Sequence, residues 1–240
     1  MSVHLVGGGR NATVYADFVA EAVDRATSVG REGPARIAVV LVHDGGGAEF
    51  FDWFAGALTG SSAADVECVP VLLAEGDTLD PTALADTDGL LVGGGLTPAY
   101  RSGLAPAFGE IRRLVASGVP YCGMSAGAAI AAERAIVGGW RIGGVVVCPE
   151  ETAEDLDEVT VEQGIGLVDV SIDVHAAQWG TLTRLIASTE AGIVPGGLGI
   201  DEDTVVIVGA GALRVVGAGS AWSVVPTETG VSVSSAAAGG

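Results

Sequence analysis

The segment Val119–Glu133 reads Val-Pro-Tyr-Cys-Gly-Met-Ser-Ala-Gly-Ala-Ala-Ile-Ala-Ala-Glu, and its pattern changes from apolar strand to alanine-rich helix at Ser125. A strand that passes directly into a helix forces the corner residue into a strained turn, so Gly123 and Gly127 must be nearly without side chains. The pattern therefore predicts a nucleophile elbow that exposes the Ser125 hydroxyl. The amide of Ala126 and the positive end of the helix would stabilise an oxyanion there. The alternative is an ordinary helix start with a serine N-cap.

Strands and helices alternate on both sides of this corner. Short apolar runs predict strands, and apolar residues at helical spacing predict helices. The expected strands are 3–6, 36–42, 66–73 and 90–92, and the expected helices are 13–27, 48–58 and 100–117. Because the strands are apolar throughout, they predict an α/β fold, a mostly parallel, flavodoxin-like sheet with helices on both faces.

The last part of the chain has a different pattern. Runs at 204–208, 213–216 and 222–225 predict a small C-terminal antiparallel extension. We expect a single domain over residues 1–230 and a disordered tail over residues 231–240. The length of 240 residues, 49% of them apolar, is enough for one such domain with a sizeable core.

Charge limits the chemistry and the partners. The net charge is −19, and all 11 basic residues are arginines. The absence of lysine excludes a serine–lysine dyad, Schiff-base chemistry and a P-loop lysine. The acidic balance disfavours nucleic acid and anionic membranes, which leaves small neutral or cationic substrates.

The cysteines and the chain start indicate no cofactor and no export. Cys68, Cys122 and Cys148 have neither zinc-site spacing nor close pairing, so we expect reduced thiols and no metal. Cys122 precedes Ser125 closely but lies inside the apolar strand, so we interpret it as a packing residue. No signal peptide and no membrane-spanning run is recognisable, which predicts a cytoplasmic protein.

Glycine-rich turns follow several of the expected strands, at the sheet edge where functional loops gather. The turn Gly93-Gly94-Gly95-Leu96-Thr97 would supply a second oxyanion donor if its strand lies beside the elbow strand. The turn Gly7-Gly8-Gly9-Arg10 lacks the spacing of a dinucleotide fingerprint.

A serine nucleophile needs a base, and the chain has three histidines. His4 lies inside the first strand, and we expect two strands between it and the elbow. His43 ends the second strand on the correct edge and is a weaker competitor. His175 follows the alternating strand 170–174 and precedes the helix 181–189, so it is the preferred base.

Four segments together resemble the peptidase E and cyanophycinase family of serine peptidases. They are residues 91–97, the elbow 123–128, Asp173-Val174-His175 with Arg184-Leu185 downstream, and residues 199–204. The resemblance implies a class I glutamine amidotransferase-like fold and a hydrolase with Ser125 as nucleophile and His175 as general base. It also implies an oxyanion hole formed by amides at Gly95 and Ala126. Family members cleave peptide bonds next to acidic residues.

The family places its histidine-orienting carboxylate between the elbow and the histidine, where this chain has Trp140 and Gly143. Neither can orient a histidine, so the orienting acid is unknown from the sequence. The substitutes are Glu133, Glu150, Glu151 and the acidic run 154–158, with Glu150 and Glu151 favoured as loop residues.

Two further departures concern the substrate. Leu96 stands where the family has Asn or Asp, and Gln178-Trp179 stand in place of an arginine-rich stretch. Arginine is the natural partner of a substrate carboxylate. We therefore predict a preference for a small peptide, amide or ester other than an aspartyl one.

Several function classes stay open. The first is a serine hydrolase working through an acyl-enzyme on Ser125. The second is a binding or regulatory protein with a weakened site. A conventional α/β-hydrolase esterase is a third, disfavoured because the catalytic acid of such an esterase normally follows a later strand. Glutaminase chemistry is disfavoured by Ser125 at the elbow and by Ala177 two residues after His175. The expected partner is a small peptide or amide, without nucleic acid or membrane, and a homodimer is left open.

Overall fold

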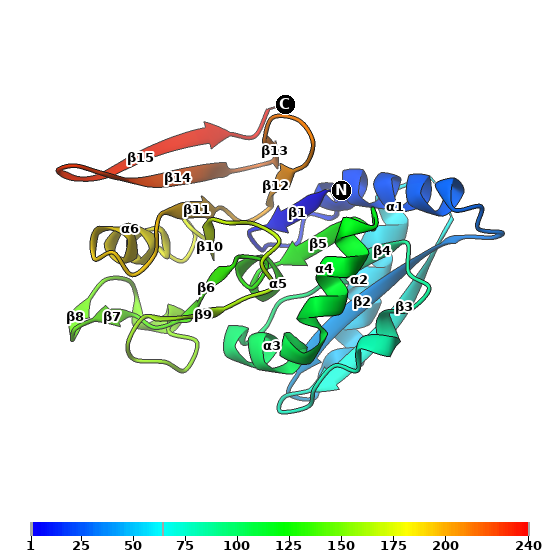
Figure 1. Cartoon of the computed structure of the whole chain (residues 1–240), viewed down its shortest axis with the longest axis horizontal. Coiled ribbons are helices and arrows are strands. Elements are labelled where there is room, and N and C mark those ends of the chain that lie inside the picture. The colour runs from blue at the N-terminus through cyan, green and yellow to red at the C-terminus, as the bar shows by residue number, and fades with distance from the viewer. Residues whose placement is uncertain (1, 64, 240) are drawn as a thin grey trace.

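The computed structural model describes residues 2–63 and 65–239. Its main sheet has seven strands in the order β13-β12-β1-β5-β4-β2-β3 (Figure 1). The strands from β1 to β3 in this order are parallel: β1 (Val3–Val6), β5 (Tyr121–Met124), β4 (Gly89–Val92), β2 (Ala35–His43) and β3 (Val66–Ala74). Two antiparallel strands extend it, β12 (Thr204–Val208) and β13 (Arg214–Gly217). The predicted mostly parallel α/β fold is confirmed.

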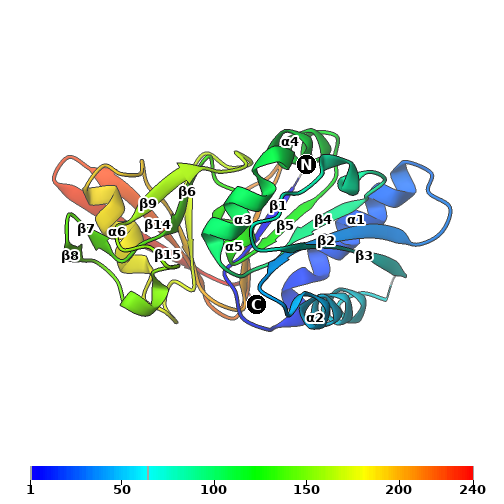
Figure 2. The same cartoon turned by 90° about the horizontal axis from the view of Figure 1, so that it is seen from below.

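Alternate residues of the parallel strands pack on opposite faces of the sheet. On one face, Leu41 packs with α1 (Ala16–Ser28) and α2 (Gly47–Gly60). On the other, Val40 packs with α3 (Thr97–Leu104) and α4 (Phe108–Ala116). Figure 2 shows the sheet between these two helix layers. The central strands β1, β4 and β5 are therefore buried on both faces, which explains why they are mostly apolar.

The helix expected over 100–117 forms as two helices. A short 3-10 turn at Ala105–Ala107 separates α3 from α4. Pro106 lies in this turn, and proline lacks the amide that an uninterrupted helix needs. Three further 3-10 turns are η1 (Ala12–Tyr15), η2 (Pro81–Leu84) and η4 (Glu150–Thr152). Among the described residues, no helix is both long and apolar enough to cross a lipid bilayer.

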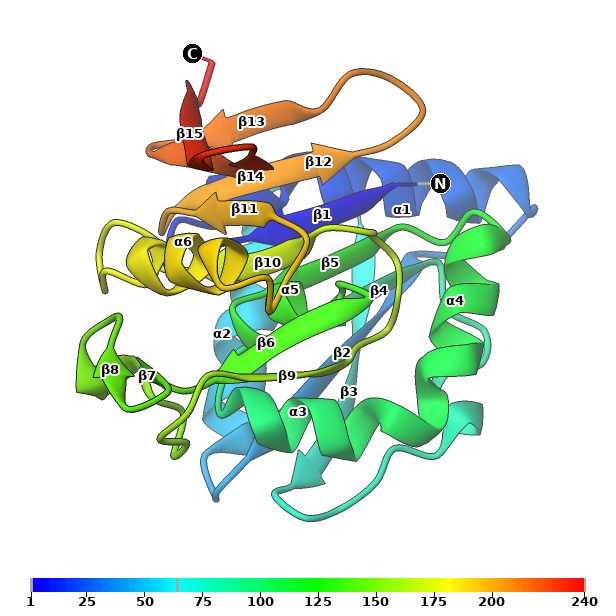
Figure 3. The same ribbon diagram turned by 60° about the vertical axis from the view of Figure 1, so that its left-hand side comes forward.

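A second sheet of four strands lies beside the main one (Figure 3). Its order is β10 (Ser171–Val174), β11 (Gly197–Ile200), β14 (Ser220–Thr227) and β15 (Gly230–Ala237). β10 and β11 are parallel, whereas β14 and β15 are antiparallel to their neighbours. Helix α6 (Leu182–Glu190) packs on this sheet, where its Leu185 lies in one apolar cluster with Val224 of β14.

The disordered tail expected over 231–240 is wrong for residues 231–237, which belong to β15. Eight residues of β15 pair in unbroken register with β14. The pairing depends on backbone hydrogen bonds, and the small Ser and Ala side chains of this segment do not hinder them. Because these residues are not typical of strands, the sequence pattern does not predict β15. Residue 240 lies outside the described residues.

The chain from β6 to β9 forms an arm with two small two-stranded sheets, seen beside α6 in Figure 1. One pairs β6 (Arg134–Gly138) with β9 (Thr160–Gln163), and the other pairs β7 (Arg141–Ile142) with β8 (Val145–Val146). The predicted acidic run 154–158 lies on this arm.

The expected position of His4 is wrong. β1 is the direct neighbour of β5, and His4 stands opposite Cys122, so no strand separates His4 from the elbow strand. The reason is the doubly wound order, in which the first strand takes a central place in the sheet. His4 is nevertheless fully buried, with Glu21 at 3.4 Å from its Nε2 atom, away from Ser125.

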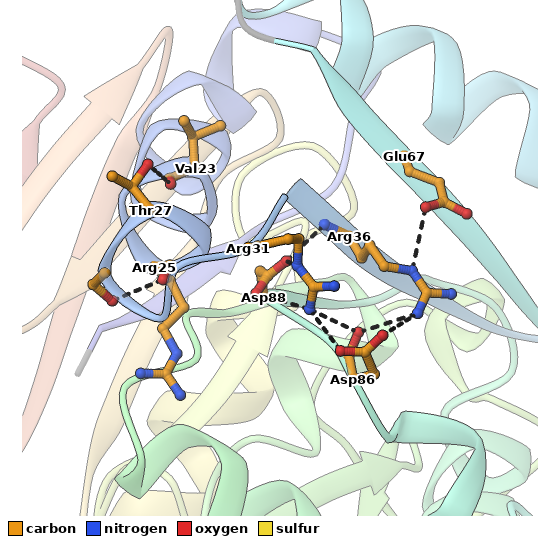
Figure 4. Close-up of polar contacts among 9 residues, drawn as sticks. Val23, Arg25, Thr27, Arg31, Arg36, Glu67, Asp86 and Asp88 are labelled. Atoms are coloured by element: carbon orange, nitrogen blue, oxygen red, sulfur yellow. Dashed lines mark hydrogen bonds and ion pairs between the residues drawn. The ribbon is translucent and has the colours of Figure 1, made fainter. Parts of the chain in front are cut away.

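Ion pairs join the strands at the amino ends of β2 and β4 (Figure 4). The buried Asp88 carboxylate accepts hydrogen bonds from the Arg31 guanidinium and, at 2.9 Å, from the Arg36 amide. The exposed Asp86 carboxylate contacts the same two arginines at 2.8 and 2.6 Å, and Arg36 also reaches Glu67 at 3.2 Å. This amino-end cluster therefore lies at the end of the strands opposite to Ser125.

Candidate active site

Ser125 lies at the sharp turn between β5 and the short helix α5 (Ala126–Ala129). Its φ of 52° and ψ of −110° are rare for a residue with a side chain and mark a strained backbone. A Cβ on Gly123 would lie 2.4 Å from the Gly127 carbonyl oxygen, and one on Gly127 would lie 2.2 Å from that of Val92. Only glycine fits at these two positions, so the turn can be this tight.

His175 follows β10, and its Nε2 atom lies 2.8 Å from the Ser125 hydroxyl. Its backbone also has a positive φ of 56°, and its amide donates to the Gly7 carbonyl at 2.9 Å. A Cβ on Gly8 would lie 2.1 Å from the imidazole Cε1 atom, so the glycine turn after β1 leaves room for the ring. The structure therefore brings together the two residues predicted as nucleophile and base.

Trp179 stacks on the His175 ring, with ring centroids 3.9 Å apart and planes inclined by 9°. It lies one short turn after the histidine, whose carbonyl accepts a hydrogen bond from the Trp179 amide at 2.9 Å. The imidazole is thus held by the stacked indole and by the Gly8 backbone, which restricts it to the orientation that faces Ser125.

The second ring nitrogen of His175, Nδ1, lies 2.8 Å from the Glu202 carboxylate. Glu202 follows β11, and the parallel register Val174↔Ile200 places the ends of β10 and β11 side by side. The Gln178 side chain accepts a hydrogen bond from the Glu202 amide at 2.9 Å. With a carboxylate at Nδ1, that nitrogen carries the proton and Nε2 is free to accept one from Ser125.

Glu202 is the residue that the sequence reasoning missed. The sequence favours Glu150 and Glu151, between the elbow and the histidine, as the orienting acid, but the carboxylate that contacts His175 comes after it in the chain. The segment 199–204 was recognised as part of the family pattern without a role for this residue. The contact depends on the parallel pairing of β10 with β11, which the sequence alone does not show.

Burial lowers the pKa of His175 below its ordinary value, while the hydrogen bond and the charge of Glu202 act in the opposite direction. The His175 side chain is 9% exposed, so the loss of hydration dominates. His175 is therefore neutral at neutral pH, the form in which its Nε2 atom can take a proton.

The glycine turn after β4 lies against Ser125, because β4 and β5 are neighbours in the main sheet, as expected. A Cβ on Gly94 would lie 2.9 Å from the Ser125 Cβ atom. The Tyr100 hydroxyl donates to the Gly94 carbonyl at 2.9 Å and holds the turn. Within residues 2–63 and 65–239, the amides of Gly95 and Ala126 have no hydrogen-bond acceptor.

A cleft of about 980 Å³ opens over Ser125 and His175. Its aromatic lining comes from Phe50, Trp140 and Trp179, and Arg10 lies at its rim. Five carboxylate side chains also line it: Glu150, Glu151, Glu154, Asp155 and Asp157. The cleft is therefore strongly negative, and the acidic run of the arm contributes most of that charge.

Glu154 is the most enclosed of these carboxylates. Its Oε2 atom accepts a hydrogen bond from the Thr97 amide at 2.8 Å, at the start of α3. Burial raises the pKa of Glu154, and the Thr97 hydrogen bond only partly compensates. Glu154 therefore links the arm to the glycine turn beside Ser125.

A buried ion pair holds the arm against the second sheet. Arg184 of α6 donates to Asp173 of β10 at 2.7 and 2.9 Å. Its Nη1 atom also donates to the carbonyls of Gly139 and Thr152 at 3.1 and 2.8 Å. Asp173 and Arg184, both part of the recognised sequence pattern, thus position the arm that forms one wall of the cleft.

The remaining candidates lie outside this arrangement. His43 ends β2, where its Nδ1 atom accepts a hydrogen bond from the Gly45 amide at 3.0 Å. Cys122 is fully buried in β5, and burial raises the pKa of its thiol. The interpretation of Cys122 as a packing residue agrees with its place in the apolar core.

No protein-family profile matches the sequence. Two cyanophycinases, from Synechococcus elongatus and Thermosynechococcus vestitus, are each 32% identical over 164 residues, which are 67% of this chain and 43% of the relative. The cyanophycinase of Nostoc sp. is 35% identical over 126 residues, 51% of this chain and 39% of the relative. The chain thus spans less than half the length of the curated relatives it matches.

Solved structures show the same fold. A peptidase from an acI-B1 actinobacterium superposes with a TM-score of 0.66 at 18% identity, covering 100% of this chain and 95% of that one. A putative peptidase E protein from Listeria monocytogenes superposes with a TM-score of 0.52 at 16% identity, covering 90% and 98%. The likeness in sequence to cyanophycinases and in fold to solved peptidases supports a peptidase E- and cyanophycinase-like family for this chain.

Proposed function

We propose that the chain is a serine-type hydrolase that cleaves a small peptide or amide through an acyl-enzyme on Ser125. The observation that carries the proposal is the continuous hydrogen-bonded path from the Ser125 hydroxyl through His175 to Glu202, with both links at 2.8 Å. A nucleophile, a base and an orienting carboxylate in this order are the working parts of a catalytic triad.

The proposed reaction starts when His175 Nε2 takes the Ser125 hydroxyl proton and Oγ attacks the substrate carbonyl carbon. The oxyanion of the tetrahedral intermediate would accept hydrogen bonds from the Gly95 and Ala126 amides. Glu202 stabilises the imidazolium meanwhile. The C–N bond then breaks, His175 gives its proton to the leaving amine, and water attacks the resulting ester with His175 again as base.

The alternative of a binding or regulatory protein rested on a missing orienting acid. Glu202 at 2.8 Å from His175 Nδ1 supports the catalytic alternative instead. The strained backbone of Ser125 supports it as well, because backbone strain persists mainly where function needs it.

The cleft supports a neutral or positively charged substrate rather than an aspartyl one. Five carboxylates line it, and Arg10 is the basic residue among its described lining residues. A negative cleft repels a substrate carboxylate and attracts an ammonium or guanidinium group. Near His175, the neutral Gln178 side chain accepts a hydrogen bond from the Glu202 amide, and Trp179 stacks on the imidazole ring. Neither residue therefore supplies a positively charged partner for a substrate carboxylate.

A fluorophosphonate probe tests the reaction, since it forms a covalent bond with an activated serine. We expect labelling of the wild type, loss of labelling in Ser125→Ala, and unchanged labelling in the control Ser117→Ala, at the C-terminal end of α4 and outside the cleft lining. Labelling that persists in Ser125→Ala, or its absence from the wild type at every pH, would contradict the proposal. The cleavage rates of alanyl, arginyl and aspartyl dipeptides then test the substrate class, and a preference for the aspartyl one would contradict it.

A further inference from the structure

Strand β15 forms the free edge of the second sheet. It pairs with β14 on one side, and no strand of the described residues pairs with its other side. It is the outermost strand in Figure 1. Most of its side chains are exposed, including Val233 at 41%.

The edge of β15 lacks the features that normally keep sheet edges apart. Folded proteins protect edge strands with proline, charged residues, bulges or short length. The long edge strand β3 follows this rule, since it contains Pro70 and Glu67. β15 spans eight residues, Gly-Val-Ser-Val-Ser-Ser-Ala-Ala, with unbroken register and neither proline nor charge.

The register shows which backbone groups lie at the free edge. The Ala238 amide donates to the Gly219 carbonyl at 2.9 Å, in line with the pairs from Ser220↔Ala237 onward. Hydrogen-bonded pairs alternate along an antiparallel ladder, so the even-numbered residues of β15 direct their backbone groups to β14. The odd-numbered residues direct theirs outward: Val231, Val233, Ser235 and Ala237.

Charge indicates what can approach this edge. The chain carries a net charge of −19, so two copies repel each other electrostatically over most of their surfaces. In the hairpin from Ser220 to Ala237, Glu228 is the charged residue, and it lies in the turn rather than on a strand. β15 therefore offers a neutral surface on which two copies can meet without repulsion.

We propose that β15 pairs with β15 of a second copy of this chain, antiparallel and about a two-fold axis. An antiparallel edge is complementary to itself, so one strand supplies both sides of the interface. The register that uses all outward-facing residues places Val231 opposite Ala237 of the second copy and Val233 opposite Ser235. Ser234 then lies on the axis, facing its own equivalent, and the four-stranded sheet continues across both copies.

Sedimentation of the full chain over the micromolar range tests this proposal. We expect a dimer for the wild type and a monomer for Ser235→Pro, which removes an outward amide but no hydrogen bond to β14. Ser235→Thr keeps the amide and should remain dimeric. A wild type that is monomeric throughout, or a Ser235→Pro variant that stays dimeric, would overturn the proposal.

A second pair of variants tests the register without changing the backbone. Ser234→Asp places two like charges opposite each other on the axis, and so does Ser234→Lys, so each alone should be monomeric. Their equimolar mixture should form a heterodimer. Homodimers of both variants would overturn the proposal. Hydrogen exchange provides the check on folding, because the amides of Ser232 and Ala236 should stay protected by β14 in every variant.

Discussion

The two ends of the main sheet differ in how completely their polar groups are satisfied. At the amino end, Asp88 is buried with hydrogen bonds from Arg31 and from the Arg36 amide. At the carboxyl end, Ser125 is strained and the Ala126 amide has no acceptor among the described residues. The Asp88 carboxylate is paired through both oxygens, whereas the turn at Ser125 keeps an amide without an acceptor among the described residues. The difference is consistent with a structural role for the amino-end cluster and with the proposed catalytic role for the turn at Ser125.

The largest expected effect is on activity, from Glu202→Gln. The amide cannot stabilise the imidazolium as a carboxylate does, and it permits the wrong histidine tautomer, so we expect kcat to fall by a factor on the order of 10⁴. Steady-state kinetics on the preferred dipeptide would measure it. Glu150→Gln is the matched control, because Glu150 lines the same cleft without a contact to His175. Equal losses in both variants would assign the effect to cleft charge instead.

The amino-end cluster should affect stability alone. Asp88→Asn removes a buried charge from the Arg31 guanidinium and weakens the hydrogen bond from the Arg36 amide, and we expect the free energy of unfolding to fall by about 2 to 3 kcal/mol. Denaturant titration would measure this, with kcat unchanged in the native protein. The control Asp86→Asn alters the exposed partner of the same arginines and should change stability much less. A loss of kcat in Asp88→Asn would contradict the division of roles between the two ends.

The pH dependence of kcat/KM should report His175. Its pKa lies below the ordinary value, and the base must be neutral, so activity should persist on acidification until the pH falls through that lowered pKa. Below it, the rate should drop about tenfold per pH unit. Glu202 raises this pKa, so the acid limb of Glu202→Gln should move to lower pH. A shift to higher pH would show that Glu202 does not act on the imidazole.

The smallest effect concerns the strain at the carboxyl end. Glycine adopts the positive φ of 52° at position 125 without a steric penalty, so Ser125→Gly should abolish activity and raise the free energy of unfolding by up to about 1 kcal/mol. Thermal unfolding would detect the gain. Ser125→Ala keeps a Cβ at the strained position and should show no comparable gain. A stability loss in the glycine variant would mean that the turn stores no strain.

The sequence predicted those parts of the site that depend on residues close to one another along the chain. Ser125 was identifiable because Gly123 and Gly127 flank it within one turn, and His175 because it ends an alternating strand. The glycine turn at Gly95 was identifiable for the same reason. Glu202 was missed because its relation to His175 depends on the pairing of β10 with β11, which no local pattern records.

Local patterns along the chain were enough to determine the alternation of strands and helices, the parallel character of the main sheet and the corner at Ser125, because these depend on hydrophobic periodicity and on the conformational freedom of glycine. Tertiary structure alone decided three other features. They are the central place of β1, the pairing of β15 and the contact of Glu202 with His175. The reason is physical: which strands become neighbours is set by the packing of the whole chain, and no short segment contains that information.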